Sequence, residues 1–234
     1  MLAVAPGATA ARLAVERELT ALGGVVAVSA ADADLLIIIG EPGAELADAH
    51  EDVWRQLPGP RARAHVVRPD EARTVLAAAT TQLCDPRQAQ QAGQRHDEWQ
   101  TTDLGGAHGD DGMQMPGGLM MADRSPDRDG LGLDALRVSW GPVLVDWPAG
   151  LVMNLTLQGD LVQQAEARVL PAAGSPAESF WDAGASAQRH AAAHLDSLGR
   201  LLSVAGWQGM AHRGYADCAT TSWRTPRPAG RWPN

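Results

Sequence analysis

The chain has 234 residues, of which 45% are hydrophobic and 20% charged, so it is long enough to bury the core of one ordinary domain or two small ones. Its formal net charge of −9 excludes a general nucleic-acid binder, because neutralising phosphates requires clustered Arg or Lys. No apolar run approaches the ~20 residues that span a bilayer, and we expect a cytoplasmic protein that inserts no segment into a membrane.

The first 84 residues alternate between short apolar runs and amphipathic segments. Strands are expected at 2–5, 25–28, 35–39 and 62–67, and helices at 9–22, 44–57 and 69–83. The run from Leu35 to Ile39 is apolar at every position, as is typical of a strand buried on both faces of a parallel sheet. In the helix at 9–22 we expect one face to meet the core and the charged residues to lie on other faces. The expected core residues are Leu13, Leu19 and Leu22, and the charged residues are Arg12, Glu16, Arg17 and Glu18. The alternation predicts an α/β fold with a small doubly wound parallel sheet of the flavodoxin-like kind in domain 1–84.

The rest of the chain divides into three parts. Residues 85–130 are rich in Gly, Asp, Gln and Met without apolar periodicity, which predicts an acidic linker. Between His96 and Asp134 nine acidic residues stand against two arginines, so this stretch carries most of the net charge. In residues 131–210 we expect a β-hairpin plus helix segment, with strands at 136–140, 150–157 and 161–169, a tight turn at Gly159-Asp160 and a helix within 179–207. Residues 211–234 have no pattern and predict a disordered tail.

Two stretches of the first domain carry a resemblance to a known family. Ala31-Asp32-Ala33-Asp34-Leu35-Leu36-Ile37-Ile38-Ile39-Gly40 is followed by Val53-Trp54-Arg55-Gln56-Leu57-Pro58-Gly59-Pro60-Arg61. In order and spacing, over about residues 2–67, they resemble the small cluster-carrying subunit of NADH:quinone oxidoreductase (complex I) and the small subunit of nickel–iron hydrogenases. An iron–sulfur cubane needs four thiolates, whereas Cys84 and Cys218 are the only cysteines here. The resemblance therefore implies a degenerate, clusterless relative.

The second half carries a fainter resemblance. Trp140-Gly141-Pro142, Leu151 to Leu157 and Gly159-Asp160-Leu161-Val162 resemble the start of the large quinone-side subunit of complex I and of hydrogenase large subunits. Neither the nickel-binding cysteine pairs nor a quinone site has a counterpart in this sequence. The two resemblances together imply a non-catalytic accessory, assembly or docking protein of a membrane-associated redox complex. Its partners would be the other subunits, through which it would lie at the membrane periphery, and we expect no catalytic residues and no resident cofactor.

The alternative function is copper or nickel binding and delivery by the linker. Four methionines fall within nine residues, although the whole chain has seven. Thioether and imidazole groups suit copper, so a metal site would use His108, Met113, Met115, Met120 and Met121. Methionines in a Gly-rich connector can equally cover apolar surface. Both interpretations stay open.

A second pair of metal-ligand residue types lies four apart on the expected C-terminal helix. His190 and His194 have the spacing that metal-binding helices use, but the Glu of a metalloprotease HExxH motif is missing. The alternative is that both histidines pack at the rim of the helix. Its apolar stripe is expected at Ala187, Ala191, Leu195, Leu198 and Leu202, with Arg189, Asp196 and Arg200 facing away.

Overall fold

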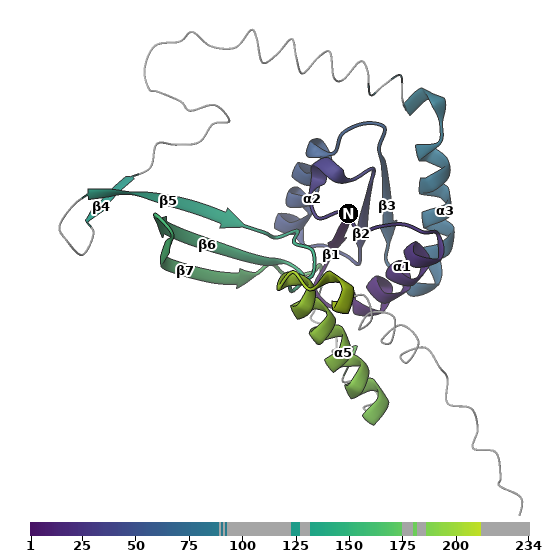
Figure 1. Ribbon diagram of the computed structural model, residues 1–234. Helices are drawn as coiled ribbons and strands as arrows, with labels where there is room; N and C mark the ends of the chain where they lie inside the picture. The colour runs from purple at the N-terminus through teal and green to yellow at the C-terminus, as the bar shows by residue number, and fades with distance from the viewer. Residues whose placement is uncertain are drawn as a thin grey trace, which may run out of the picture.

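The computed structural model describes residues 1–88, 90, 92, 123–126, 132–174, 180–181 and 186–211. An N-terminal α/β unit is followed by an antiparallel sheet that extends away from it and by a long helix that returns to it (Figure 1). The predicted α/β fold is confirmed. Within the part of the chain described here, no helix combines the length and the apolar character needed to cross a membrane.

The α/β unit contains a three-stranded parallel sheet in the order β1-β2-β3. Its elements are β1 (Leu2–Val4), α1 (Thr9–Ala21), a 3₁₀ turn (Ala30–Asp32), β2 (Leu35–Ile39), α2 (Ala44–Gln56), β3 (Ala62–Val66), a second 3₁₀ turn (Pro69–Glu71) and α3 (Ala72–Leu83). The central strand β2 is buried at four of its five positions, as its uninterrupted apolar sequence predicts.

Helices cover both faces of this sheet, which makes it doubly wound. Ile37 and Ile39 pack against α1 and α3 on one face, while Leu36 and Ile38 pack against the α2 side on the other. This division follows from the alternation of side chains along β2. The central strand therefore joins two separate apolar clusters into one core.

The predicted strand at 25–28 is wrong. These residues form no strand, and Val25 and Val28 are 90% and 75% exposed. Only Ala27 of this run packs against the core, beside Met1 and Ala30. An apolar run becomes a strand only where a neighbouring strand pairs with it, and this one has no such partner.

The second sheet is antiparallel, in the order β4-β5-β6-β7. Its strands are β4 (Asp123–Pro126), β5 (Gly132–Trp140), β6 (Leu151–Gln158) and β7 (Leu161–Val169), and the predicted hairpin at Gly159-Asp160 joins β6 to β7. β4 and the helical residues 86–88 fall inside the range 85–130, for which the sequence predicts a linker. Most other residues of that range, and the predicted tail from 212 onward, lie outside the described residues.

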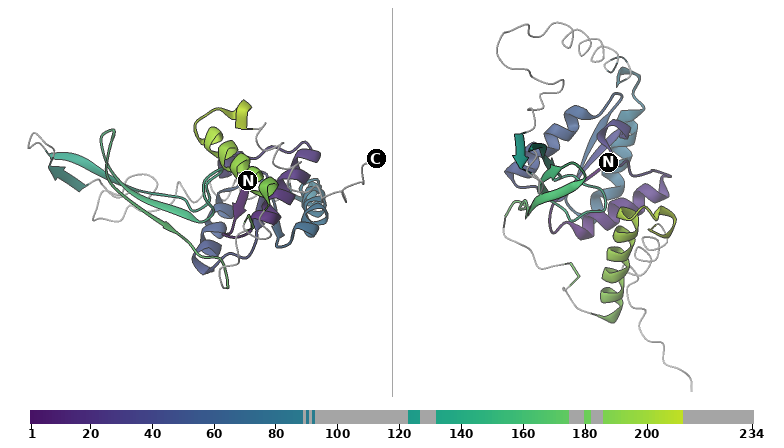
Figure 2. Two further views of the ribbon diagram at one scale, coloured as in Figure 1. Left: turned by 90° about the horizontal axis from the view of Figure 1, so that it is seen from below. Right: turned by 60° about the vertical axis from the view of Figure 1, so that its left-hand side comes forward.

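We call the sheet β4–β7 the arm, because it projects from the α/β unit in each view where its length is visible (Figures 1 and 2). β5 runs toward the α/β unit, β6 runs away from it and β7 returns. The turn at Gly159-Asp160 thus lies at the far end, and Trp140, Leu151 and Val169 lie at the end near the α/β unit, which we call the root.

The long C-terminal helix is α5 (Ala187–Val204), and the prediction of its buried face is wrong. The buried residues are Ala192, Asp196, Gly199 and Ser203, whereas Leu198 is 49% exposed. Asp196 lies inward because α1 presents a buried arginine to it, and Gly199 and Ser203 are small enough for close approach. Because Arg12 is 184 residues away in the sequence, the hydrophobic periodicity of α5 could not predict that Asp196 is buried.

Candidate functional site

The arm has one apolar and one polar face. Residues that lie opposite one another in adjacent antiparallel strands project to the same side of the sheet. The strand register therefore forms four apolar rows: Leu136–Leu157–Val162, Val138–Leu155–Ala165, Trp140–Met153–Ala167 and Leu151–Val169. We call these eleven residues the apolar face; none of them carries a charge.

The apolar face is exposed. Leu136 is 46% exposed, Val162 is 57% and Val169 is 58%, and all nine residues of β7 are exposed. The members contributed by β6 are half-buried, because the neighbouring strands flank them. A sheet with one apolar face is ordinarily packed against a second layer. The Trp147 ring, from the loop before β6, contacts Trp140, but no helix or strand of the described residues supplies that layer.

The opposite face of the arm is polar along most of its length. Arg137, Thr156 and Gln164 form one row, and Ser139, Asn154 and Glu166 form the next. The Ser139 hydroxyl donates to Asn154 Oδ1 at 2.9 Å, which ties two strands together on this side. An antiparallel sheet with one apolar and one polar face is typically covered by another layer on its apolar face and exposed to water on its polar face.

The size of the apolar face sets the strength of contact that it can make. Three strands about 4.8 Å apart, with a rise of about 3.3 Å per residue over about eight residues, give an area on the order of 400 Å². Patches of that size are often functional on monomeric proteins. Covering it would remove roughly 800 Å² from water on both partners, which is below the 1,200–2,000 Å² of a standard stable interface. The face alone thus fits a weak complex.

The root fixes the arm to the carboxyl edge of the parallel sheet. Gly43 N donates to Pro171 O at 3.2 Å, and Ala173 N donates to Glu41 O at 2.8 Å. Val152 and Leu170 of the root form a buried cluster with Ala5 and Leu46 of the α/β unit. In open α/β sheets ligands bind in the crevice outside the carboxyl ends of the strands. Here the root of the arm fills the part of that crevice beyond β2.

Gly150 shows how closely the root approaches the α/β unit. Its φ of +74° is a conformation that favours glycine, and a Cβ there would lie 2.8 Å from Leu170 O and 3.2 Å from Pro6 Cγ. Arg168 of β7, which lies opposite Val152 in the strand register, forms an ion pair with Glu45 of α2. These contacts hold the arm in one direction relative to the parallel sheet.

A buried charge cluster joins α5 to α1. Arg12 Nη2 donates to both carboxylate oxygens of Asp196 at 2.8 Å, and Nη1 donates to Glu16 Oε1 and Oε2 at 2.8 and 3.1 Å. Arg12 and Asp196 are 3% and 4% exposed. Burial lowers the pKa of Arg12, but the two carboxylates outweigh burial, so its pKa lies above the ordinary value and the guanidinium stays charged.

The burial of Arg12 corrects the prediction that this residue lies on an outward face of α1. The buried residues of that helix are Ala11, Arg12, Leu13, Ala14, Val15 and Glu18, whereas Leu22 is 59% exposed. Leu13 packs with Ala192 of α5, and Phe180, Trp181 and Leu195 border this contact. The Arg12–Glu16 spacing of four was visible in the sequence, but such pairs are usually solvated.

His50 of α2 is a further buried polar group. It is 1% exposed, and neither ring nitrogen has a hydrogen-bond partner in the described residues. Burial, reinforced by the positive charge of Arg63, lowers the pKa of His50 from 6.5 to about 4, although Glu51 acts in the opposite direction. His50 is therefore neutral at physiological pH.

The predicted metal ligands divide between described and undescribed residues. His108, Met113, Met115, Met120 and Met121 lie outside the described residues. His190 and His194 both lie exposed on α5. Over the described ranges, no three His, Cys, Asp or Glu side chains are grouped so that they could hold a metal ion. Cys84 is a free, exposed thiol at the end of α3.

The apolar face and the Arg12–Asp196 pair are the two features that sequence reasoning missed. The first had a signal, because Leu136, Val138 and Trp140 alternate with polar residues along one strand and Leu151, Met153 and Leu155 do so along the next. The Arg12–Asp196 pair had no such signal, because its two residues lie far apart in the sequence.

Comparison of the chain with protein-family models, with curated proteins and with solved structures gives no match.

Proposed function

We propose that the protein is a non-catalytic docking or assembly subunit of a membrane-associated redox complex, and that the apolar face of the arm contacts the partner subunit. The observation that carries the proposal is the exposure of an uncharged sheet face on a projecting arm. A partner that covers this face removes apolar surface from water and supplies the second layer that the sheet lacks.

The geometry of the root supports a docking role. The arm is held to the α/β unit by the backbone contacts of Gly43 and Ala173, by a buried cluster and by the Arg168–Glu45 ion pair. A binding surface held in one direction loses little conformational freedom on binding, so more of the contact energy appears as affinity. The same root fills part of the crevice in which parallel sheets of this type bind ligands.

The class of partner follows from the resemblance of residues 2–67 and of the hairpin to subunits of complex I and of hydrogenases. Those subunits work in large assemblies, and a clusterless relative retains the surfaces of such a protein without its electron carrier. The partner surface must itself be mainly apolar, because the face offers no charge and, apart from the Trp140 indole N–H, no hydrogen-bonding side chain to it. A redox subunit with an uncovered apolar patch fits this requirement.

The experiment is site-specific photo-crosslinking in cells that contain the protein and its redox complexes. A photoreactive amino acid is placed at Ala165 on the apolar face or, as the matched control, at Gln164, the neighbouring residue on the polar face of the same strand. We expect crosslinks from position 165 to one subunit of an oxidoreductase, identified by mass spectrometry, and few from position 164. Crosslinks at equal yield from both positions, or only to unrelated proteins from position 165, would refute the proposal.

A pair of substitutions tests the same surface without a crosslinker. Val162→Glu places a charge on the apolar face, and Gln164→Glu places the same charge on the polar face two residues away. Both positions are exposed, so neither change should unfold the protein. We expect Val162→Glu to abolish binding to the redox subunit in an equilibrium titration, which detects weak complexes, and Gln164→Glu to preserve it. Equal retention by both variants would show that the contact lies elsewhere.

A further inference from the structure

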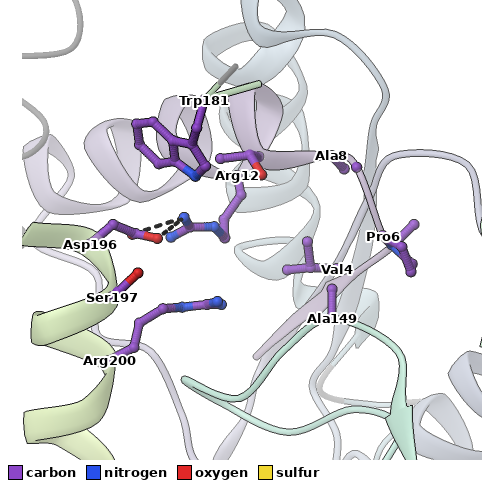
Figure 3. Close-up of a pocket in the computed structure, with 12 residues that line it drawn as sticks. Val4, Pro6, Ala8, Arg12, Ala149, Trp181, Asp196, Ser197 and Arg200 are labelled. Atoms are coloured by element: carbon purple, nitrogen blue, oxygen red, sulfur yellow. Dashed lines mark hydrogen bonds and ion pairs between the residues drawn. The ribbon is translucent and has the colours of Figure 1, made fainter. Parts of the chain in front are cut away.

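A cavity of about 290 Å³ lies where α5 crosses the beginning of α1, at the carboxyl end of β1 (Figure 3). The turn after β1, the first turns of α1, Ala149 from the loop before β6, Trp181 and α5 line it. This volume is several times the ~30 Å³ that a water molecule occupies in the liquid, so the cavity has room for a small molecule. The root of the arm leaves this part of the carboxyl edge open.

Two arginines point into this cavity from different helices. Figure 3 shows the guanidinium groups of Arg12 and Arg200 directed into the same space, with Asp196 beside Arg12 only. Arg12 is neutralised by its two carboxylates. Arg200, which is half-buried, makes no hydrogen bond or ion pair with any residue that the structure describes, although its charge acts on Glu16 from a distance. Arg200 therefore brings to the cavity a positive charge that no described residue neutralises, and an anion would complement it.

The other polar groups of the cavity are mainly donors. The Trp181 indole N–H and the Thr9 hydroxyl have no hydrogen-bond partner among the described residues, and an indole can only donate. The single carboxylate, Asp196, already accepts from Arg12 with both oxygens. The groups left without partners are thus a guanidinium, an indole N–H and a hydroxyl. Such a set is complemented by a ligand rich in acceptor oxygens.

We propose that this cavity binds a small molecule that carries a phosphate-type oxyanion. Arg200 pairs with the oxyanion, Trp181 and Thr9 donate to it, and the apolar body of the ligand lies against Val4 and the Trp181 ring. Arg12 holds α1 and α5 in place around the ligand through its ion pair with Asp196. The site lies beyond the carboxyl end of β1, the edge of an open α/β sheet outside which ligands ordinarily bind. This proposal does not rest on the docking function.

The test measures binding of inorganic phosphate to the full chain by the shift in melting temperature and by NMR titration, against sodium chloride at equal ionic strength. We expect a saturable effect of phosphate that chloride does not reproduce. Arg200→Gln should weaken binding at least about tenfold, the factor that losing one charge-assisted hydrogen bond of about 1.4 kcal/mol produces. Trp181→Phe, which keeps the ring and deletes the donor, should weaken binding by a smaller factor.

The matched control is Arg55→Gln, which deletes the same charge from an exposed position on α2. We expect it to bind phosphate as the unmodified protein does. Phenyl phosphate should bind more tightly than inorganic phosphate, because its ring can pack against Trp181. Two outcomes would overturn the proposal: no effect of phosphate beyond that of chloride, or equal binding by the Arg200→Gln variant and the unmodified protein.

One further arm identifies the source of the oxyanion. The protein is sedimented with vesicles of phosphatidylcholine that do or do not contain phosphatidic acid. Sedimentation that requires phosphatidic acid and is lost in Arg200→Gln would identify a lipid headgroup as the ligand. Phosphate binding without such sedimentation would identify a soluble phosphate ester.

Discussion

Replacing Asp196 by Asn should destabilise the protein by about 3 kcal/mol, because it leaves a buried guanidinium with one carboxylate instead of two. Both oxygens of Asp196 accept from Arg12 Nη2 at 2.8 Å, and the two residues are 4% and 3% exposed. The amide of Asn has the same shape but directs an NH₂ group at the arginine in place of one acceptor. Removing one member of a buried pair costs about 3–5 kcal/mol. We expect the lower end, since Arg12 keeps both hydrogen bonds to Glu16.

Urea denaturation followed by circular dichroism measures this loss as a fall in the midpoint concentration at unchanged slope. The control is Asp70→Asn, which removes a carboxylate from an exposed pair with Arg68 and should change stability by no more than about 0.5 kcal/mol. A triple variant, Arg12→Met with Glu16→Gln and Asp196→Leu, should recover most of the loss, because uncharged residues of similar volume can replace a whole buried ion cluster. A loss below about 1 kcal/mol in Asp196→Asn would refute the conclusion that this pair holds α5 to α1.

Three other predictions address the buried histidine, the root of the arm and the linker. The lowered pKa of His50 means that the unfolded chain binds more protons between pH 4 and 6.5, so stability should rise with pH across that window, by about 3 kcal/mol at most. His50→Leu should remove this dependence in melts run from pH 4 to 7, and an unchanged dependence would assign it to other groups. Gly150→Ala should destabilise the protein by about 1–3 kcal/mol in the same melts, because φ is +74° and a Cβ would lie too close to Leu170 O. An unchanged stability of Gly150→Ala would show that the root lies less close to the α/β unit. For the linker we expect Cu(I) binding, in competition with a chelator, to be equal and weak before and after replacement by Leu of Met113, Met115, Met120 and Met121; micromolar or tighter binding lost on replacement would instead favour copper delivery.

The α/β unit was predictable because its signals are local. Leu35 to Ile39 forms β2 at the predicted residues, and the helix expected at 44–57 ends within one residue of α2. Each of these elements is set by a short apolar pattern together with a turn residue that stops it. The run at 25–28 has the same apolar character but remains exposed, because strand formation also needs a neighbour to pair with.

The junction between the halves was not predictable, because its residues look solvated in their own helices. Arg12 stands among acidic residues on α1, and Asp196 interrupts the leucines of α5. Each is buried only because the other neutralises it. The two residues are 184 positions apart in the sequence, so the residue pattern within the 18-residue helix α5 cannot indicate their contact. The apolar face is an intermediate case, since its alternation is local, whereas the absence of a covering layer becomes visible only when the described elements are assembled.

The contact between Arg12 and Asp196 also has a consequence in time. At about 5–20 residues per second, a ribosome adds Asp196 roughly 10–40 s after Arg12. During that interval β1, β2 and β3 have been synthesised, but the arginine on α1 has only Glu16 to neutralise it. Until α5 has been synthesised, the side of α1 that it covers in the finished protein stays exposed. Completion of its surface depends on the arrival of α5, so a stall during synthesis of the arm would prolong the exposure of that side to chaperones and proteases.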